Sequence, residues 1–119
     1  MKQELDNESR QALMLYRMNR AYATLGEARL LADAQCFNAA VNRLYYACYY
    51  ASVALLLANR ISSQTHAGVK TMIGKHFVNT GAMPINIGKT LSLLFDKRQS
   101  GDYEDFVIKH TGTHSDLFG

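Results

Sequence analysis

Strand patterns, prolines and disulfide candidates are all scarce in this sequence of 119 residues. A single proline, Pro84, leaves long segments free to be helical, and no stretch alternates apolar and polar residues for long enough to form a convincing strand. Cys36 and Cys48 both lie within apolar helical patterns, which argues against a disulfide scaffold and is typical of a reducing compartment. The sequence therefore predicts an all-α protein without disulfide bonds.

Long hydrophobic runs are absent as well. The most apolar stretch, SVALLLAN at residues 52–59, falls well short of the roughly 20 residues that a membrane span requires. The N-terminal MKQELDNESR is too polar for a secretory signal, so we expect a cytoplasmic protein with no membrane segment. The net charge of +3 permits contact with nucleic acid without requiring it, because the basic residues are dispersed.

Motifs for metal or covalent chemistry are also missing. The four histidines do not form a convincing metal set, since Gly112 interrupts the i, i+4 pair of His110 and His114, and the others, His66 and His76, are isolated. There is no glycine-rich phosphate loop, and neither cysteine has the neighbours of an activated nucleophile. We therefore expect neither a metal nor a cofactor.

Apolar residues instead recur at helical spacing in four segments. The expected helices cover residues 8–34, residues 37–59, the segment from a cap at Ser63 or Thr65 to Gly81, and the segment from Pro84 to about Arg98. Asp6 or Asn7 can cap the first helix. The length suits a single domain over residues 1–119, with a core at about 8–106 and an irregular tail at 107–119.

The apolar positions also predict which faces are buried. The second helix is apolar around much of its circumference, so we expect it to be central. The stripes expected in the first, third and fourth helices are Leu13, Tyr16, Arg20, Ala23, Ala28 and Leu31; Val69, Met72, Ile73 and Phe77; and Ile87, Leu91, Leu94 and Phe95.

The densest aromatic feature is NRLYYACYYASVALLL, in the second helix. It contains Tyr45, Tyr46, Tyr49 and Tyr50. Their spacing places Tyr45 along the helix from Tyr49, and Tyr46 from Tyr50. Such rings can fill a core edge or a dimer surface, but Asn42 and Arg43 add polar groups to a strongly buried helix, where each must be satisfied.

Two further features could carry chemistry. His66 opens the third helix, where the helix dipole favours the neutral imidazole and so suits hydrogen bonding or acid–base work, although a structural capping role is an alternative. In RQSGDY, Arg98 offers a forked cation for phosphate, Asp102 a carboxylate and Tyr103 a ring that can stack on a base. The plainer interpretation of RQSGDY is a helix end whose basic residues suit the dipole.

The stretches NRLYYACYYASVALLL, THAGV and RQSGDY occur in this order and together resemble the HEPN superfamily, in particular compact bacterial proteins with an Arg-x-x-x-Asp-Tyr motif. The resemblance covers about residues 8–106. It implies an up-down four-helix bundle of HEPN type with a short irregular C-terminal segment. It also implies RNA cleavage or binding, commonly as the toxin of a toxin–antitoxin system paired with a nucleotidyltransferase.

The nuclease branches of that superfamily use an Arg-x(4–6)-His pair as a metal-independent endoribonuclease site. There, His can act as general acid or base while Arg stabilises the phosphorane charge. Here no histidine follows Arg98 until His110, so the usual pair is absent. His66 is the expected substitute, because helices of alternating direction bring it to the same end of the bundle as Arg98.

Two functions therefore stay open. In an RNA-directed or toxin-like protein, the catalytic candidates are Arg98, His66 and Asp102, and the residues expected to bind RNA or a nucleotide are Arg43, Tyr46, Tyr103 and Asn42. The alternative is a non-catalytic helical module that dimerises and binds a nucleotide or a partner protein. We expect a homodimer in either case, because an irregular tail in place of a final helix leaves apolar surface uncovered.

Overall fold

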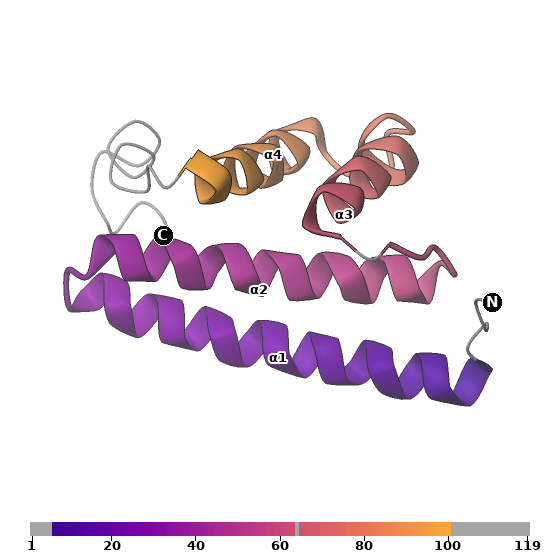
Figure 1. Ribbon diagram of the computed structural model, residues 1–119, viewed down its shortest axis with the longest axis horizontal. Coiled ribbons are helices and arrows are strands. Elements are labelled where there is room, and N and C mark those ends of the chain that lie inside the picture. Colours follow the sequence, from indigo (N-terminus) through magenta and orange to yellow (C-terminus); the bar gives the residue numbers. More distant parts are fainter. Residues whose placement is uncertain (1–5, 64, 101–119) are drawn as a thin grey trace.

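The computed structural model describes residues 6–63 and 65–100, with the backbone alone at 97–100. Helices account for all the regular structure in these residues: α1 (Asn7–Asp33), α2 (Phe37–Ala58), α3 (His66–Ile73), the π-helical turn η1 (Gly74–Val78) and α4 (Ile85–Ser100). Figure 1 shows α1 and α2 as a long antiparallel hairpin, with α3 and α4 on the side of α2 away from α1. The predicted all-α bundle is confirmed. None of the described helices is long and apolar enough to cross a membrane.

Side-chain caps begin two of the helices. Asp6 accepts a hydrogen bond from the backbone N–H of Ser9 at 2.7 Å, and this bond is the main cause that lowers the pKa of the Asp6 carboxyl. Thr65 accepts one from the N–H of Gly68 at 2.9 Å at the start of α3. Both residues were among the caps expected from the sequence.

Two helices end in a left-handed residue that is not glycine. After α1, the N–H of Cys36 reaches the carbonyl of Leu31 at 2.8 Å, and Gln35 between them has a φ of 62°. Arg60 has a φ of 59° after α2. Glycine usually takes this position, because other residues pay a steric cost there.

Small side chains pack α1 against α2. The buried residues of α1 are Ala21, Thr24, Ala28 and Ala32, and α2 buries Ala40, Ala47 and Ala54 at heptad spacing. The stripe expected for α1 is confirmed only in part: Ala28 is buried and Leu13, Arg20 and Leu31 are half-buried, but Ala23 is exposed and Tyr16 is 57% exposed. Alanine and threonine are thus the fully buried residues of α1, and several of its larger side chains, such as Leu30, are exposed.

The main hydrophobic core lies on the other side of α2. Its buried members come from α2, α3 and α4, and they are Tyr45, Leu56, Val69, Ile73 and Phe95. Val41 and Leu94 form a second cluster. Ile87, expected on the buried face of α4, is instead 47% exposed. The neighbouring Gly88 makes the close contact there, since a Cβ on it would come within 2.8 Å of Val78 in η1.

Candidate functional site

His66, the first residue of α3, contacts the buried Tyr45 of α2. The chain after α2 runs back along that helix before α3 begins, so α3 starts beside the middle of α2 (Figure 1). There the hydroxyl of Tyr45, a residue only 1% exposed, shares a hydrogen bond with Nδ1 of His66. The bond satisfies a buried polar group while His66 stays exposed.

Two further tyrosines of α2 contact the same imidazole, and a third contacts these two. Tyr49 stacks on His66 with ring centroids 4.2 Å apart, and Tyr46 meets it edge-on at 6.2 Å. Tyr50 lies 6.0 Å from Tyr49 and 6.1 Å from Tyr46. We call Tyr45, Tyr46, Tyr49, Tyr50 and His66 the aromatic cluster. The predicted alignment of Tyr45 with Tyr49 is confirmed, because their rings stack at 6.2 Å.

Two arginines from different helices lie over rings of the aromatic cluster. The guanidinium of Arg43 is 5.3 Å from the centroid of Tyr46, and that of Arg20 in α1 is 5.7 Å from the centroid of Tyr50. Both distances suit cation–π attraction. Arg43 also pairs with Glu27 of α1 at 3.3 Å. The cluster therefore carries two guanidinium groups and one carboxylate at its edge.

Arg20 is a site residue that the sequence interpretation missed. The sequence feature that could have identified Arg20 is the position of the turn between the first two helices. Glu27 and Arg43 each lie eight residues from Gln35, and Arg20 and Tyr50 each lie fifteen residues from it. In an antiparallel helix pair, residues equally distant from the turn lie opposite each other, so the hairpin pairs Arg20 with Tyr50.

An open cleft of about 700 Å³ adjoins the aromatic cluster between α3, η1 and α4. Tyr45 and Phe95 are among its lining residues, and Lys70 of α3 pairs with Asp96 of α4 across it at 2.5 Å. His66 also lines the cleft, so it lies where the cleft meets the aromatic cluster. A π-helical turn such as η1 is frequently found at functional sites.

The structure brings some of the expected site residues together. Tyr46 contacts both Arg43 and His66, and Asn42 is half-buried in α2 one turn before Tyr46. The backbone of Arg98 lies in the last turn of α4, about one turn beyond Phe95, whose ring meets Tyr45 at 5.2 Å. The side chain of Arg98 lies outside the described residues.

Asp102 and Tyr103 also lie outside the described residues. The combination of Arg98, His66 and Asp102 thus stays a prediction. Arg60, which precedes His66 in the sequence, donates to Oδ1 of Asn7 at 2.5 Å and so points toward the start of α1.

Other chemistry near the site is limited in the part of the chain that the structure describes. There, no three His, Cys, Asp or Glu side chains come close enough to hold a metal ion. Burial raises the pKa of the Cys48 thiol to about 11, so this group stays protonated and is a poor nucleophile at neutral pH.

Comparison with known proteins gives consistent matches. The model of the HEPN domain family matches residues 14–116. A UPF0332 protein of Thermotoga maritima is 37% identical over 98 residues, which cover 82% of this chain and 74% of the relative. A UPF0332 protein of Gloeobacter violaceus is 41% identical over 86 residues (72% and 68%), and a candidate toxin of Methanocaldococcus jannaschii is 34% identical over 83 residues (70% and 62%). No solved structure matches the chain.

Proposed function

The chain belongs to the HEPN domain family, and on that premise we propose that it is a toxin-like protein that acts on RNA. A similar protein of Methanocaldococcus jannaschii is named as a candidate toxin. The observation that carries the RNA assignment is the placement of Arg43 over Tyr46, next to the stack of His66 on Tyr49. A guanidinium can bind phosphate, and aromatic rings can stack on bases.

Tyr45 gives His66 a defined role in this proposal. When Nδ1–H donates to the hydroxyl oxygen of Tyr45, the Nε2 atom of the neutral imidazole is free to accept a proton, and the protonated ring can return it to a leaving oxygen. Tyr45 then acts as a positioning residue, because its ring is fixed in the core. The arrangement resembles an acid–base histidine whose ring is held by a second hydrogen-bonding group.

We extend the proposal to Arg98 and Asp102 as partners of His66 in RNA cleavage. Arg98 would stabilise the charge on the phosphorane, His66 would transfer the proton, and Asp102 would orient Arg98 or assist the transfer. Tyr103 and Asn42 would bind the RNA beside the reacting phosphate. The ion pair between Lys70 and Asp96 supports this combination, since it joins α3 one turn after His66 to α4 two residues before Arg98.

An RNA cleavage assay without divalent metal tests the proposal. We expect the wild-type protein to cut RNA and the variants His66→Ala and Arg98→Ala to lose at least about a hundred-fold in rate, the contribution typical of an acid–base group. Arg43→Ala should weaken RNA binding, whereas Arg29→Ala should not. If wild type, His66→Ala and Arg98→Ala all cut at the same rate, these residues are not catalytic.

Binding without cleavage is the second candidate function. The absence of a histidine soon after Arg98 favours it. In that case the protein would bind RNA or a nucleotide, with Arg43→Ala weakening binding and no RNA product forming.

The proposal includes partners. Exposed apolar side chains support a homodimer, and those on α1 are Leu15, Tyr16, Tyr22 and Leu30, which are 57% to 71% exposed. Light scattering would give the mass of a dimer for the wild type and of a monomer for Leu30→Glu, if α1 forms the interface. A small nucleotidyltransferase is the partner that the family resemblance implies, and co-purification of the two proteins would test it.

A further inference from the structure

Arg20 and Tyr50 repeat the arrangement of Arg43 and Tyr46. In each pair a guanidinium lies over a tyrosine ring, at 5.7 Å and 5.3 Å respectively. Arg43 and Tyr46 both belong to α2, whereas Arg20 reaches from α1 to Tyr50 of α2. Neither the proposed proton transfer nor the proposed stabilisation of phosphate charge involves Arg20. The pair of Arg20 and Tyr50 therefore needs a separate explanation.

The two pairs are joined through ring contacts. The Tyr50 centroid is 6.1 Å from that of Tyr46 and 6.0 Å from that of Tyr49, which in turn stacks on His66 at 4.2 Å. Arg20, Tyr50, Tyr46 and Arg43 thus form one continuous surface that ends at His66. The four side chains are half-buried, so each is held by its neighbours while part of its surface stays accessible to a ligand.

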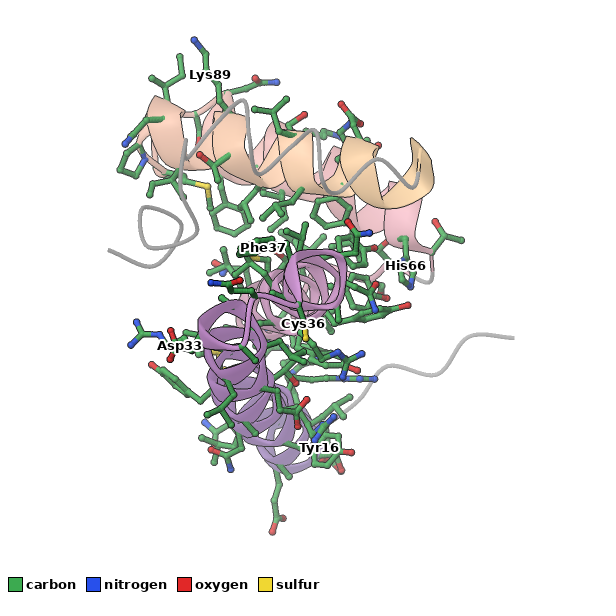
Figure 2. The ribbon with its side chains drawn as sticks, turned by 90° about the vertical axis from the view of Figure 1, so that its left-hand side faces the viewer. Tyr16, Asp33, Cys36, Phe37, His66 and Lys89 are labelled. Carbon is green, nitrogen blue, oxygen red and sulfur yellow. The ribbon has the colours of Figure 1, made fainter. Side chains whose placement is uncertain are left out.

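A third pair of an arginine and a tyrosine lies nearer the start of α1. The guanidinium of Arg17 lies 6.0 Å from the Tyr16 ring, and Tyr16 is 57% exposed. Figure 2 shows Tyr16 and His66 on the same side of the molecule, with Asp33 on the opposite side. This third pair therefore lies on the same side of the molecule as His66.

We propose that Arg20 and Tyr50 form a second nucleotide subsite, adjacent to Arg43 and Tyr46, that binds an unpaired RNA strand. This inference rests on the proposed function and adds to it the form of the RNA. Each guanidinium supplies N–H donors to one phosphate, and each tyrosine supplies a stacking surface to one base. Bases in a duplex are stacked on each other and cannot offer their faces to protein rings. Two adjacent pairs therefore suit two neighbouring nucleotides of a single strand.

The test is the binding of a fluorescent hexauridylate, measured by anisotropy with the intact chain. We expect Arg20→Ala to weaken binding about ten-fold, the loss typical of one stacking and phosphate contact. Arg20→Lys keeps the charge but loses the planar stacking group, so it should show part of this loss. The matched control is Arg29→Ala, which removes the same charge from α1 at a position half a turn away around the helix, nine residues later.

Two results would overturn the second subsite while leaving the proposed function intact. One is an Arg20→Ala protein that binds hexauridylate like Arg29→Ala while Arg43→Ala binds weakly. The other is equal affinity of the wild type for a single-stranded RNA and for the same strand held in a stable GC-rich duplex. If the wild type binds no RNA, the proposed function fails and the subsite with it.

Discussion

The hydroxyl of Tyr45 and Nδ1 of His66 connect the buried core to the exposed start of α3 by a hydrogen bond. Tyr45 also meets Phe95 of α4 edge-on at 5.2 Å, so one side chain contacts both helices that cover this side of α2. The orientation of the exposed imidazole is thus set from inside the protein.

Tyr45→Phe tests this relationship, because it keeps the ring and removes the hydroxyl. We expect a loss of about 1 kcal/mol in the free energy of unfolding, the usual value of one hydrogen bond, together with slower RNA cleavage. Urea denaturation measures the first effect. Tyr22→Phe is the control, since Tyr22 is 69% exposed. Equal stability of the two variants would contradict a structural role for the Tyr45 hydroxyl.

Substitution of Gly68 tests whether the Thr65 cap of α3 holds His66 in place. A Cβ at this position would lie 2.3 Å from Oγ of Ser63 and 2.9 Å from Oγ1 of Thr65. Gly68→Ala should therefore displace the Thr65 cap and cost about 1 kcal/mol or more. Gly26→Ala on α1 is the matched control, since nothing lies within 4 Å of its Cβ position, and it should raise stability by about 0.5–1 kcal/mol. The melting temperatures of Gly68→Ala and Gly26→Ala are compared by thermal unfolding. Equal shifts would show that the segment before α3 accommodates the added Cβ without loss of stability.

Cys48 gives a prediction for alkaline pH. Burial raises the pKa of its thiol from the ordinary 9.0 to about 11, so the folded protein keeps this proton between pH 9 and pH 11 while the unfolded chain loses it. The protonated Cys48 thiol therefore makes its full contribution to the free energy of unfolding below pH 9, and this contribution is lost as the pH rises through 11. Cys48→Ala should lessen the fall in the free energy of unfolding across this window, and Cys36→Ala, at an exposed thiol, should not. Parallel falls in both variants would contradict the assignment.

Glu27 gives a prediction for RNA affinity. Its carboxylate pairs with Arg43 at 3.3 Å and brings negative charge to the surface proposed to bind phosphate. Glu27→Gln should raise the affinity for hexauridylate about two- to five-fold, the range expected for a partly exposed ion pair. The same substitution at Glu8, in the first turn of α1, is the control. Weaker binding by Glu27→Gln would indicate that the ion pair positions Arg43 for its ligand.

The helices and their caps were predictable because they depend on local chemistry. Asp6 and Thr65 lie at positions where short oxygen-bearing side chains satisfy the first backbone N–H groups, and the sequence alone identifies them. The central position of α2 also follows from its composition, since its apolar residues cover more than one face.

The buried face of α1 was not predictable in the same way. Hydrophobic periodicity gives weight to large side chains, but Ala21, Thr24 and Ala32 make the contact with α2, and Leu30 is 71% exposed. The direction in which α1 faces decides where Arg20 points. Recognising Arg20 as a site residue therefore required the tertiary contact between the helices, whereas Arg43, Tyr46 and His66 could be identified from one motif and one helix start.

Arg20 and Tyr50 lie at the same number of residues from Gln35, and so do Glu27 and Arg43. These matched distances make the hairpin sensitive to insertions and deletions. One residue inserted between Arg20 and Glu27 would rotate Arg20 by about 100° around α1 and move it away from Tyr50, while the pair of Glu27 with Arg43 would be kept. A residue added between Glu27 and Gln35 would disturb both pairs. The number of residues in each arm of the hairpin, and not only their identity, is therefore part of what specifies this surface.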